Sequence, residues 1–294
     1  MPDEFFSSTQ ITATQKGMIV NLDLHGQNVA IIGGGNGIGL AIAEEFYREG
    51  CHVALIDLDP ATPETAEKVR QQSGTTETDS PRCEGWVTDI TDESATHSTF
   101  QAIHHEWGDL RHVVIAAGIG SGRFGFPFWN MKPEDWRRVL DVNIMGVVHV
   151  AHACHAILQQ KDFGSLTLLA SVAGQIGSQT DPPYSAAKAA VINFGQCMAK
   201  DLAPFGIRVN TICPGMVQTQ LNRSVWQAWN DQQPDSEKRS YEDWAGEKVS
   251  NVVPLQRWQT PQDIANLAVF LASSRGQNIT GQTMNVDGGF VMHW

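Results

Sequence analysis

The 294-residue sequence lacks the cysteine spacings that mark a metal site or a disulfide framework. It contains five cysteines, an odd number, and no Cys-x-x-Cys pair. A zinc cluster is therefore not indicated, and we expect reduced thiols in a cytoplasmic protein. The cysteines are Cys51, Cys83, Cys154, Cys197 and Cys213.

Positive charge and long apolar runs are also scarce. Twenty Lys and Arg residues face 32 Asp and Glu residues, which gives a formal net charge of −12. Such an acidic chain is a poor partner for nucleic acid or an anionic membrane surface. Because no basic region precedes an apolar stretch and no apolar run reaches bilayer length, we expect neither a signal peptide nor a membrane span.

What the sequence does contain is an alternation of short apolar runs and longer amphipathic segments. This pattern predicts an α/β fold, in which one doubly wound parallel sheet of about seven strands has helices on both faces. We expect a polar tail over residues 1–22 and a single domain over 23–294. The apolar runs cover residues 28–32, 52–57, 84–88, 112–117, 165–170, 207–212 and 283–288, and helical patterns include 39–50, 189–206 and 261–273.

One polar insertion, residues 216–258, interrupts this alternation. A connection of that length inside a compact domain is usually functional or disordered. Its four tryptophans argue against full disorder. The next helix is predicted to begin at Pro261, since proline is favoured at the first helical position. The tryptophans are Trp226, Trp229, Trp244 and Trp258.

A glycine-rich loop joins the first predicted strand to the first helix. Gly33, Gly37 and Gly39 are spaced G-x-x-x-G-x-G, and Asn36 and Ile38 lie between them. Glycines allow positive φ and close backbone approach, while a helix N-terminus offers unpaired N–H groups to a pyrophosphate. A tight strand–helix turn would need similar residues, but the strand before and the helix after favour a dinucleotide site.

Acidic residues follow the second and third predicted strands. Asp57 comes 18 residues after Gly39, close to the spacing of a carboxylate that binds the adenosine ribose. Because Leu58 and Asp59 add no basic group for a 2′-phosphate, we predict NAD rather than NADP. Asp89 is either a partner of the adenine amino group or a cap of the next helix, and its spacing does not separate the two.

Tyr184 and Lys188 lie four residues apart, which in a helix places both on one face. An isolated pair of this kind is common. A free phenol has a pKa near 10, too high for efficient proton transfer at neutral pH, and a nearby ammonium favours its ionised form. The pair therefore suggests an activated phenol, provided that a cofactor and a substrate reach it.

Taken in order, the motifs resemble those of the short-chain dehydrogenase/reductase family over roughly residues 22–290. Ser171 and Tyr184 are 13 residues apart, as in the family pattern. The Tyr184–Lys188 spacing differs from that of enoyl reductases of the same fold, whose two residues lie farther apart. The matching motifs are residues 33–39, Asp57, residues 116–118, Asn143, Ser171, residues 184–188 and residues 214–219.

The resemblance implies a Rossmann-type domain and four catalytic residues. Tyr184 would act as acid and base, and Ser171, at a strand end, would orient the substrate oxygen. Lys188 would lower the phenol pKa and hold the nicotinamide ribose, and Asn143 would join a water-linked proton relay. Each has a structural alternative: a packed tyrosine, a strand-end cap or a buried amide contact.

The same resemblance supplies a set of cofactor contacts. Pro214 and Gly215 would pack against the nicotinamide, although a plain turn would also use them. Thr219 would contact the carboxamide or the phosphates. The predicted NAD contacts are Gly33, Asn36, Gly37, Ile38, Gly39, Asp57, Leu58, Asp89, Ile90, Ala116, Ala117, Gly118, Tyr184, Lys188, Pro214, Gly215, Val217 and Thr219.

Substrate specificity is expected from residues 118–129, residues 172–183 and the insertion, which resembles a substrate lid. Aromatic and carboxamide side chains there suit a polyol, a sugar or a small hydroxy compound. Arg123, next to Phe124, either holds a substrate anion or is a surface arginine, and Asp181 either touches substrate or starts a turn. The predicted substrate contacts are Arg123, Ser171, Gln175, Gln179, Asp181, Tyr184 and Trp226.

We therefore expect an NAD-dependent oxidoreductase that interconverts a secondary alcohol and its carbonyl. Two alternatives are a catalytically idle NAD-binding regulator and a reductase of a carbonyl such as a 3-oxoacyl or steroid ketone. The apolar helical segments 147–158 and 189–202, with residues 285–294, suggest a homotetramer by the same resemblance. No metal is expected.

Overall fold

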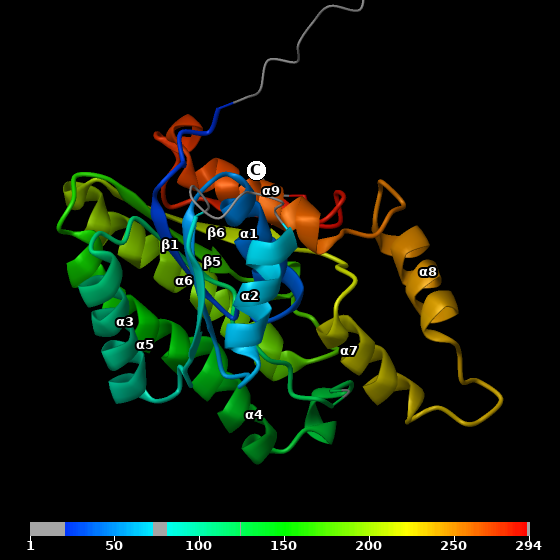
Figure 1. Cartoon of the computed structure of the whole chain (residues 1–294). Coiled ribbons are helices and arrows are strands. Elements are labelled where there is room, and N and C mark those ends of the chain that lie inside the picture. Colours follow the sequence, from blue (N-terminus) through cyan, green and yellow to red (C-terminus); the bar gives the residue numbers. More distant parts are fainter. Residues whose placement is uncertain (1–20, 73–80, 124, 293–294) are drawn as a thin grey trace, which may run out of the picture.

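The computed structural model describes residues 21–72, 81–123 and 125–292. The predicted tail therefore lies almost wholly outside the described residues, as does Phe124. Seven strands form one parallel sheet in the order β3-β2-β1-β4-β5-β6-β7, which confirms the predicted doubly wound sheet (Figure 1). The strands are β1 Asn28–Ile32, β2 His52–Asp57, β3 Cys83–Val87, β4 His112–Ile115, β5 Gly164–Leu169, β6 Ile207–Pro214 and β7 Thr283–Val286.

Helices cover both faces of the sheet. On one face α1 packs against α9, and on the other α3 packs beside α5, with α6 against β6. Two separate apolar cores result, one on each side of the sheet. The helices are α1 Gly37–Arg48, α2 Thr62–Gln72, α3 Glu93–Trp107, α4 Pro133–Leu140, α5 Gly146–Leu158, α6 Pro182–Leu202, α7 Gln220–Asn230, α8 Tyr241–Val252 and α9 Pro261–Ala272.

Helix α6 begins at Pro182, before the helical pattern predicted over residues 189–206. It includes Tyr184 and Lys188, whose four-residue spacing suits a helix. The Asp181 carboxylate accepts a hydrogen bond from the Tyr184 backbone N–H, and proline fits the first turn because it needs no N–H partner there. Tyr184 consequently lies in the first turn of α6, at the carboxyl edge of the sheet.

The strand order changes direction between β1 and β4. The chain runs from β1 outward to β2 and β3, then returns to place β4 on the other side of β1. The connections that follow β1 and β4 therefore run in opposite directions, and they leave a crevice at the carboxyl ends of these two strands. This is where open α/β sheets bind ligands.

The insertion, residues 216–258, is helical and projects from one side of the domain (Figure 1). Its two ends meet in a short parallel bridge between Val217 and Gln259. Inside it, α7 and α8 share an aromatic cluster in which Tyr241 and Trp244 are buried. The expectation that its tryptophans argue against full disorder is thus confirmed.

One helical run passes a length and composition test for membrane crossing, contrary to our reading of the sequence. Residues 133–158 are continuous through α4, a π-helical turn and α5. The core helices of soluble proteins pass the same test. Here Val147, Val150 and Cys154 are buried in the sheet's apolar core, which explains the apolar composition.

Candidate active site

Two adjoining cavities lie at the carboxyl ends of the strands. The first, of about 330 Å³, lies over β1 and β2 and contains the glycine loop, and we call it the β1–β2 cavity. The second, of about 350 Å³, extends over β5 and β6 to the insertion, and we call it the Tyr184 cavity. Because Ile38, Ala116 and Gly118 line both, one extended ligand can occupy the two together.

Backbone packing makes glycine necessary in the β1–β2 cavity. Gly33 has φ +78°, and a Cβ there would lie 2.5 Å from the Ala117 backbone nitrogen. A Cβ on Gly39 would lie 2.0 Å from the Gly33 carbonyl oxygen. Asn36, the N-cap of α1, makes no side-chain capping bond, so it leaves the N–H groups of the first turn to another acceptor. This cradle suits a phosphate group.

Two carboxylates line the outer part of the same cavity. Asp57 accepts a hydrogen bond from the Gly35 N–H at 2.9 Å, which ties the glycine loop to the end of β2. Asp89 accepts from the Thr91 N–H at 2.9 Å. Since Asp92 caps α3, the alternative that Asp89 caps this helix is wrong. Asp89 is thus left at the cavity wall.

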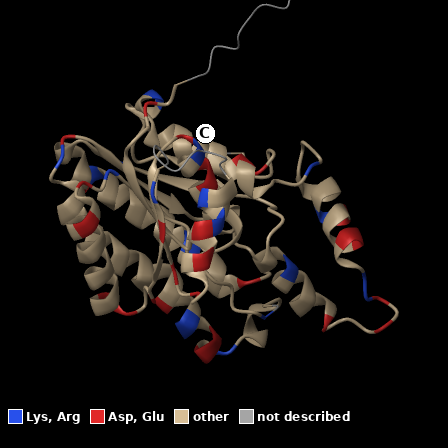
Figure 2. Cartoon of the chain, in the orientation of Figure 1, with Lys and Arg blue, Asp and Glu red and all other residues tan. Residues whose placement is uncertain are grey.

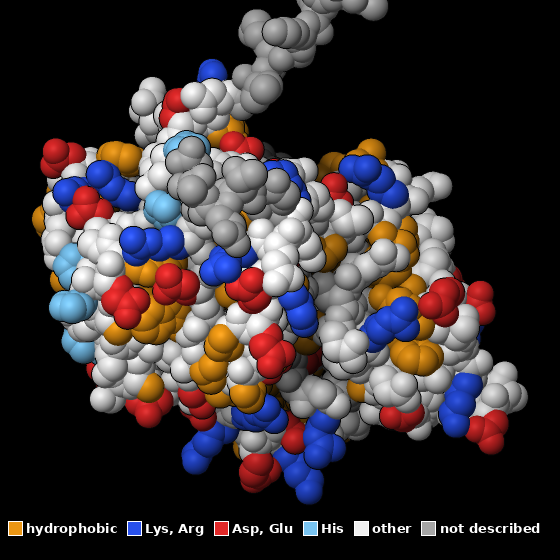
Figure 3. All heavy atoms as spheres, viewed as in Figure 1, with side chains coloured by type: hydrophobic (Ala, Val, Ile, Leu, Met, Phe, Trp, Pro, Cys, Tyr) orange, Lys and Arg blue, Asp and Glu red, His pale blue; other side chains and the backbone are white. Residues whose placement is uncertain are grey.

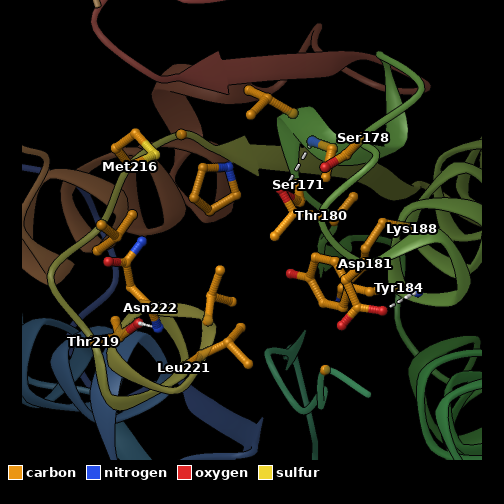
Figure 4. A pocket seen from close by; sticks show the side chains of 18 of the residues that line it. Ser171, Ser178, Thr180, Asp181, Tyr184, Lys188, Met216, Thr219, Leu221 and Asn222 are labelled. Carbon is orange, nitrogen blue, oxygen red and sulfur yellow. Dashed lines mark hydrogen bonds between the residues drawn. The ribbon is translucent and has the colours of Figure 1, made fainter. Parts of the chain in front are cut away.

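The Tyr184 cavity gathers three of the four predicted catalytic side chains, and Asn143 does not line it. Tyr184 and Lys188, one turn apart on α6, line it together with Ser171, which follows β5 (Figure 4). The Lys188 ammonium lies 5.6 Å from the centroid of the Tyr184 ring and donates to the Leu169 carbonyl at 2.8 Å. Lys188 is almost fully buried, so this bond fixes its position.

Burial dominates the protonation of both groups. It raises the pKa of Tyr184 to about 12, an effect that a hydrogen bond with Ser171 opposes and the Asp181 charge reinforces. Burial also lowers the pKa of Lys188 to about 8. The loss of water around the phenol outweighs the hydrogen bond with Ser171. That Lys188 lowers the phenol pKa stays a prediction.

Asn143 lies in the π-helical turn Asp141–Met145, which joins α4 to α5. Its side chain is fully buried, donates to the Ile119 carbonyl at 2.7 Å and accepts from the Ile119 N–H at 2.9 Å. A Cβ on Gly118 would lie 2.7 Å from Asn143 Oδ1 and 3.0 Å from Lys188 Nζ. Asn143 and Lys188 therefore flank one stretch of backbone at the cavity floor.

Every predicted cofactor contact lines at least one of the two cavities. The residues beside the β1–β2 cavity come from the loops after β1, β2, β3 and β4. The other predicted contacts, in the Tyr184 cavity, come from α6, from the end of β6 and from the loop after it. In that loop Thr219 also caps α7 by accepting from the Asn222 N–H. The spacing of the motifs thus placed residues from distant parts of the chain along one continuous surface.

The predicted substrate contacts divide into two groups. Ser171, Asp181 and Tyr184 line the Tyr184 cavity, whereas Gln175, Gln179, Arg123 and Trp226 do not. Figure 4 shows Asp181 and Tyr184 on one side of this cavity, opposite Leu221 and Asn222 from the insertion.

Other partners hold the second group. Arg123 is exposed and forms an ion pair with Asp135 at 2.8 Å. The Gln175 amide exchanges two hydrogen bonds with Asn285, at 2.8 and 2.9 Å. The Trp226 indole donates to the Arg239 carbonyl at 3.2 Å. Gln179 is exposed beside a separate surface hollow that Phe126 and Trp129 line.

Asp181 combines the two roles that its sequence position left open. It starts α6, and it also lines the cavity. Its second carboxylate oxygen accepts from the Ser121 N–H at 2.7 Å, which fixes the loop after β4. Burial raises the pKa of Asp181, while the bonds to Ser121 and Tyr184 oppose that rise.

Several cavity residues escaped prediction from the sequence. Helix α8 contributes Trp244, Lys248 and Val252, and the carboxyl-terminal segment contributes Phe290. The four-residue spacing of the three α8 residues indicates a common helix face, but nothing in the sequence says what that face covers. Arg138, on α4, lines the β1–β2 cavity and was missed for the same reason.

The described residues hold no cluster of three or more His, Cys, Asp or Glu side chains placed to bind a metal. All five cysteines lie within the described parts of the chain and are free thiols there. Only Cys197 among them is exposed.

Comparison with known proteins agrees with this geometry. A family model described as Enoyl-(Acyl carrier protein) reductase matches residues 33–291. A 2-(S)-hydroxypropyl-CoM dehydrogenase from Xanthobacter autotrophicus is 32% identical over 271 residues, covering 91% of this chain and 98% of the relative.

Solved structures give the same result. An NAD⁺-bound xylitol dehydrogenase superposes with a TM-score of 0.81 at 26% identity, over 90% of this chain and 99% of that one. An L-sorbose reductase from Gluconobacter frateurii, solved with NADPH and L-sorbose, gives a TM-score of 0.83 over 93% of this chain and all of that one. At 24% identity, the second shows the fold alone. The motifs, the fold and these matches together establish that the chain belongs to the short-chain dehydrogenase/reductase family.

Proposed function

We propose that this protein is an NAD-dependent oxidoreductase that interconverts a secondary alcohol and its carbonyl. One observation carries the proposal: Tyr184, Ser171 and Lys188 line a cavity that adjoins the glycine cradle. A nicotinamide held across the two cavities would supply the hydride acceptor or donor for the reacting carbon. The glycine loop and the N-terminus of α1 would hold its phosphates.

The chain's own residues handle the proton. In the reductive direction a phenol with a pKa of about 12 keeps its proton at neutral pH, so Tyr184 can donate it to the carbonyl oxygen. In the oxidative direction Tyr184 takes the proton of the alcohol, which the positive charge of Lys188 favours. The Ser171 hydroxyl orients the same substrate oxygen. Asn143 keeps the backbone beside Lys188 in place, and its part in a proton relay stays a prediction.

The preference for NAD rests on Asp57. A carboxylate at the end of β2 accepts hydrogen bonds from ribose hydroxyls and repels a 2′-phosphate. The NAD⁺-bound xylitol dehydrogenase is consistent with this choice, whereas the L-sorbose reductase was solved with NADPH. Arg138 is the one basic side chain among the described residues that line the β1–β2 cavity. It lies on α4, outside the loop after β2.

The substrate is proposed to be a small hydroxy compound, with a polyol or a sugar as the first candidates. The Tyr184 cavity must hold the nicotinamide as well, and its volume of about 350 Å³ is near the lower end for ligand sites. We also propose that the insertion acts as a lid, because Leu221, Asn222 and Trp244 form one wall of this cavity.

The oligomeric state of the protein and its location in the cell are also proposals. We infer a cytoplasmic homotetramer that pairs through α5 and α6. Light scattering tests the assembly, since a mass equal to the 32.2 kDa of one chain would overturn it.

Replacement of Tyr184 by phenylalanine tests the mechanism. Tyr184→Phe removes the titrating hydroxyl and keeps the ring, so we expect kcat for alcohol oxidation to fall about 10²- to 10⁴-fold. NADH binding, followed by nucleotide fluorescence, should stay within about twofold because the ring still fills its place. Full activity in this variant would refute the role of the tyrosine.

The wild-type protein separates the proposal from the idle-regulator alternative. A panel of polyols, sugars, secondary alcohols and hydroxysteroids is offered with NAD, and NADH formation is recorded. Binding of NADH without turnover of any of these would favour the regulator. Turnover of at least one supports the enzyme.

A further inference from the structure

The insertion places one cation inside the Tyr184 cavity. Lys248 lies on α8, four residues after Trp244 and four before Val252, and all three line the cavity. This face of α8 is therefore turned toward the space in front of Tyr184. Figure 3 shows that hydrophobic side chains are gathered on the insertion, at the right of that view. Lys248 is half-buried, and the two α8 residues that line the cavity with it, Trp244 and Val252, are apolar.

Three other cations of the insertion are paired with carboxylates. Arg223 pairs with Glu242, and Lys238 and Arg239 pair with Asp235 and Glu247. Figure 2 shows acidic and basic positions close together along the ribbon of the insertion. These pairs lie at the surface and leave no net attraction for a ligand.

Lys248 differs from them. Among the residues that the structure describes, it forms neither an ion pair nor a hydrogen bond. Its ammonium nitrogen lies 4.1 Å from the centroid of the Trp244 ring, and Trp244 is only 5% exposed. The ring face attracts the cation and holds it at the cavity wall, but it accepts no hydrogen bond from the three N–H groups. Burial lowers the pKa of Lys248, as expected of a cation without an anionic partner.

The charges opposite Lys248 restrict what it can bind. The catalytic side of the cavity contains the Asp181 carboxylate and the Lys188 ammonium, whose charges are of opposite sign. The net charge of −12 on the whole chain disfavours a multiply charged anion. A substrate with one negative charge can place that charge beside the Lys248 ammonium and away from the Asp181 carboxylate. This arrangement pairs the ammonium with the least electrostatic repulsion. A carboxylate is a compact monoanion that accepts charge-assisted hydrogen bonds from a lysine ammonium.

We propose that the substrate is a short hydroxy acid, whose carboxylate binds Lys248 while its secondary hydroxyl reaches Tyr184 and Ser171. This inference rests on the proposed function and narrows its substrate class. Neutral polyols and sugars would then be poor substrates. Lys248 becomes a specificity residue, and the insertion contributes charge recognition as well as a wall.

Matched pairs of substrates test the proposal. The probes are 3-hydroxybutanoate, 4-hydroxypentanoate and 5-hydroxyhexanoate, each beside its primary amide, with NAD as oxidant. The amide keeps the shape and removes the charge. For at least one pair, wild-type kcat/KM should favour the acid by about 10- to 100-fold, the value of one hydrogen bond to a charged group.

Two variants locate the effect. Lys248→Gln should abolish the acid preference by raising KM for the acid, so that acid and amide are oxidised with similar kcat/KM. Lys248→Arg should retain most of the preference because it keeps the charge. An acid preference that survives Lys248→Gln, or equal wild-type activity on acids and amides, would overturn the inference. Neither result would disturb the proposed dehydrogenase activity.

Binding supplies a readout that needs no turnover. With NAD present, butanoate should raise the Tm of the wild type, while butanamide should not, and Lys248→Gln should lose the shift. Equal shifts by the two compounds, or none, would indicate that the Lys248 ammonium only packs on Trp244 and reaches water. The inference would then be wrong even if the enzyme oxidised neutral alcohols.

Discussion

The two halves of the site are built in different ways. The β1–β2 cavity is shaped by backbone: a Cβ on Gly33 or Gly39 would overlap main-chain atoms. The Tyr184 cavity is shaped by side chains from β5, α6, the insertion and Phe290. A cofactor that many enzymes share can be bound by backbone groups, which do not depend on residue type. A substrate that is specific to one enzyme needs side chains, which differ between enzymes. The first half is therefore the more sensitive to small changes.

The largest expected effect is in the backbone-built half. In Gly39→Ala the added methyl would lie 2.0 Å from the Gly33 carbonyl oxygen, so the glycine loop must move. We expect a loss of about 1–3 kcal/mol in the free energy of unfolding, together with loss of NADH binding. Urea denaturation and nucleotide fluorescence measure the two effects.

Gly177→Ala is the matched control, at a glycine that lines neither of the two cavities. A Cβ on Gly177 meets no atom within 4 Å, and its φ is not positive. This variant should bind NADH and unfold like the wild type. If Gly39→Ala behaved in the same way, the β1–β2 cavity would not depend on close backbone packing.

A smaller effect is expected when the charge of Asp57 is removed and its shape is kept. Asp57→Asn can still accept the hydrogen bond from the Gly35 N–H, so the loop stays tied. The ratio of kcat/KM for NAD over NADP should fall about tenfold or more, because repulsion of a 2′-phosphate is lost. Steady-state kinetics with both cofactors measure this ratio.

Asp59→Asn controls for a general change in charge. Asp59 lies two residues further along the chain, outside the cavity lining, and accepts from the Ala61 N–H at 2.9 Å. Its cofactor ratio should match the wild type. A ratio unchanged in Asp57→Asn would remove the basis for an NAD preference.

The contrast between the two cavities also explains which parts of the fold and of the site could be predicted from the sequence. Strands buried on both faces are continuous apolar runs, so β1 and β2 were predicted with their observed bounds. Glycine spacing and Asp57 are local features of one strand–helix connection, and they identified the β1–β2 cavity. Lys248 could not be found, since its role depends on how α8 lies against a loop 60 or more residues away in sequence.

Arg123 and Gln175 show the converse problem. Gln175 lies shortly before Tyr184 in sequence and Arg123 lies in the loop after β4, which made both reasonable candidates for substrate binding. The structure gives each a partner within the protein, Asp135 and Asn285 respectively. Residue type and proximity in sequence cannot separate a side chain that binds ligand from one that joins two parts of the fold.

The smallest expected effect concerns coupling inside the Tyr184 cavity. The negative charge of Asp181 raises the pKa of Tyr184, so Asp181→Asn should lower it. Oxidation needs the ionised phenol, and the rising limb of kcat/KM against pH should therefore move to lower pH, by less than about one unit. The falling limb for reduction should move in the same direction, because reduction needs the protonated phenol.

Asp181→Asn also weakens the hydrogen bonds that start α6. The experiment must therefore separate this effect on stability from the effect of the lost charge. Asp181→Asn keeps one of the two acceptors that bind the Ser121 and Tyr184 N–H groups, at a cost of about 1 kcal/mol in stability. Asp92→Ala removes the cap of α3 at a similar cost of about 1 kcal/mol, at a residue that lines neither cavity. It should lower stability without moving the pH profile. A shift in both variants would trace the effect to stability, and a shift in Asp181→Asn alone would show that the residue that starts α6 also sets the proton affinity of the tyrosine beside it.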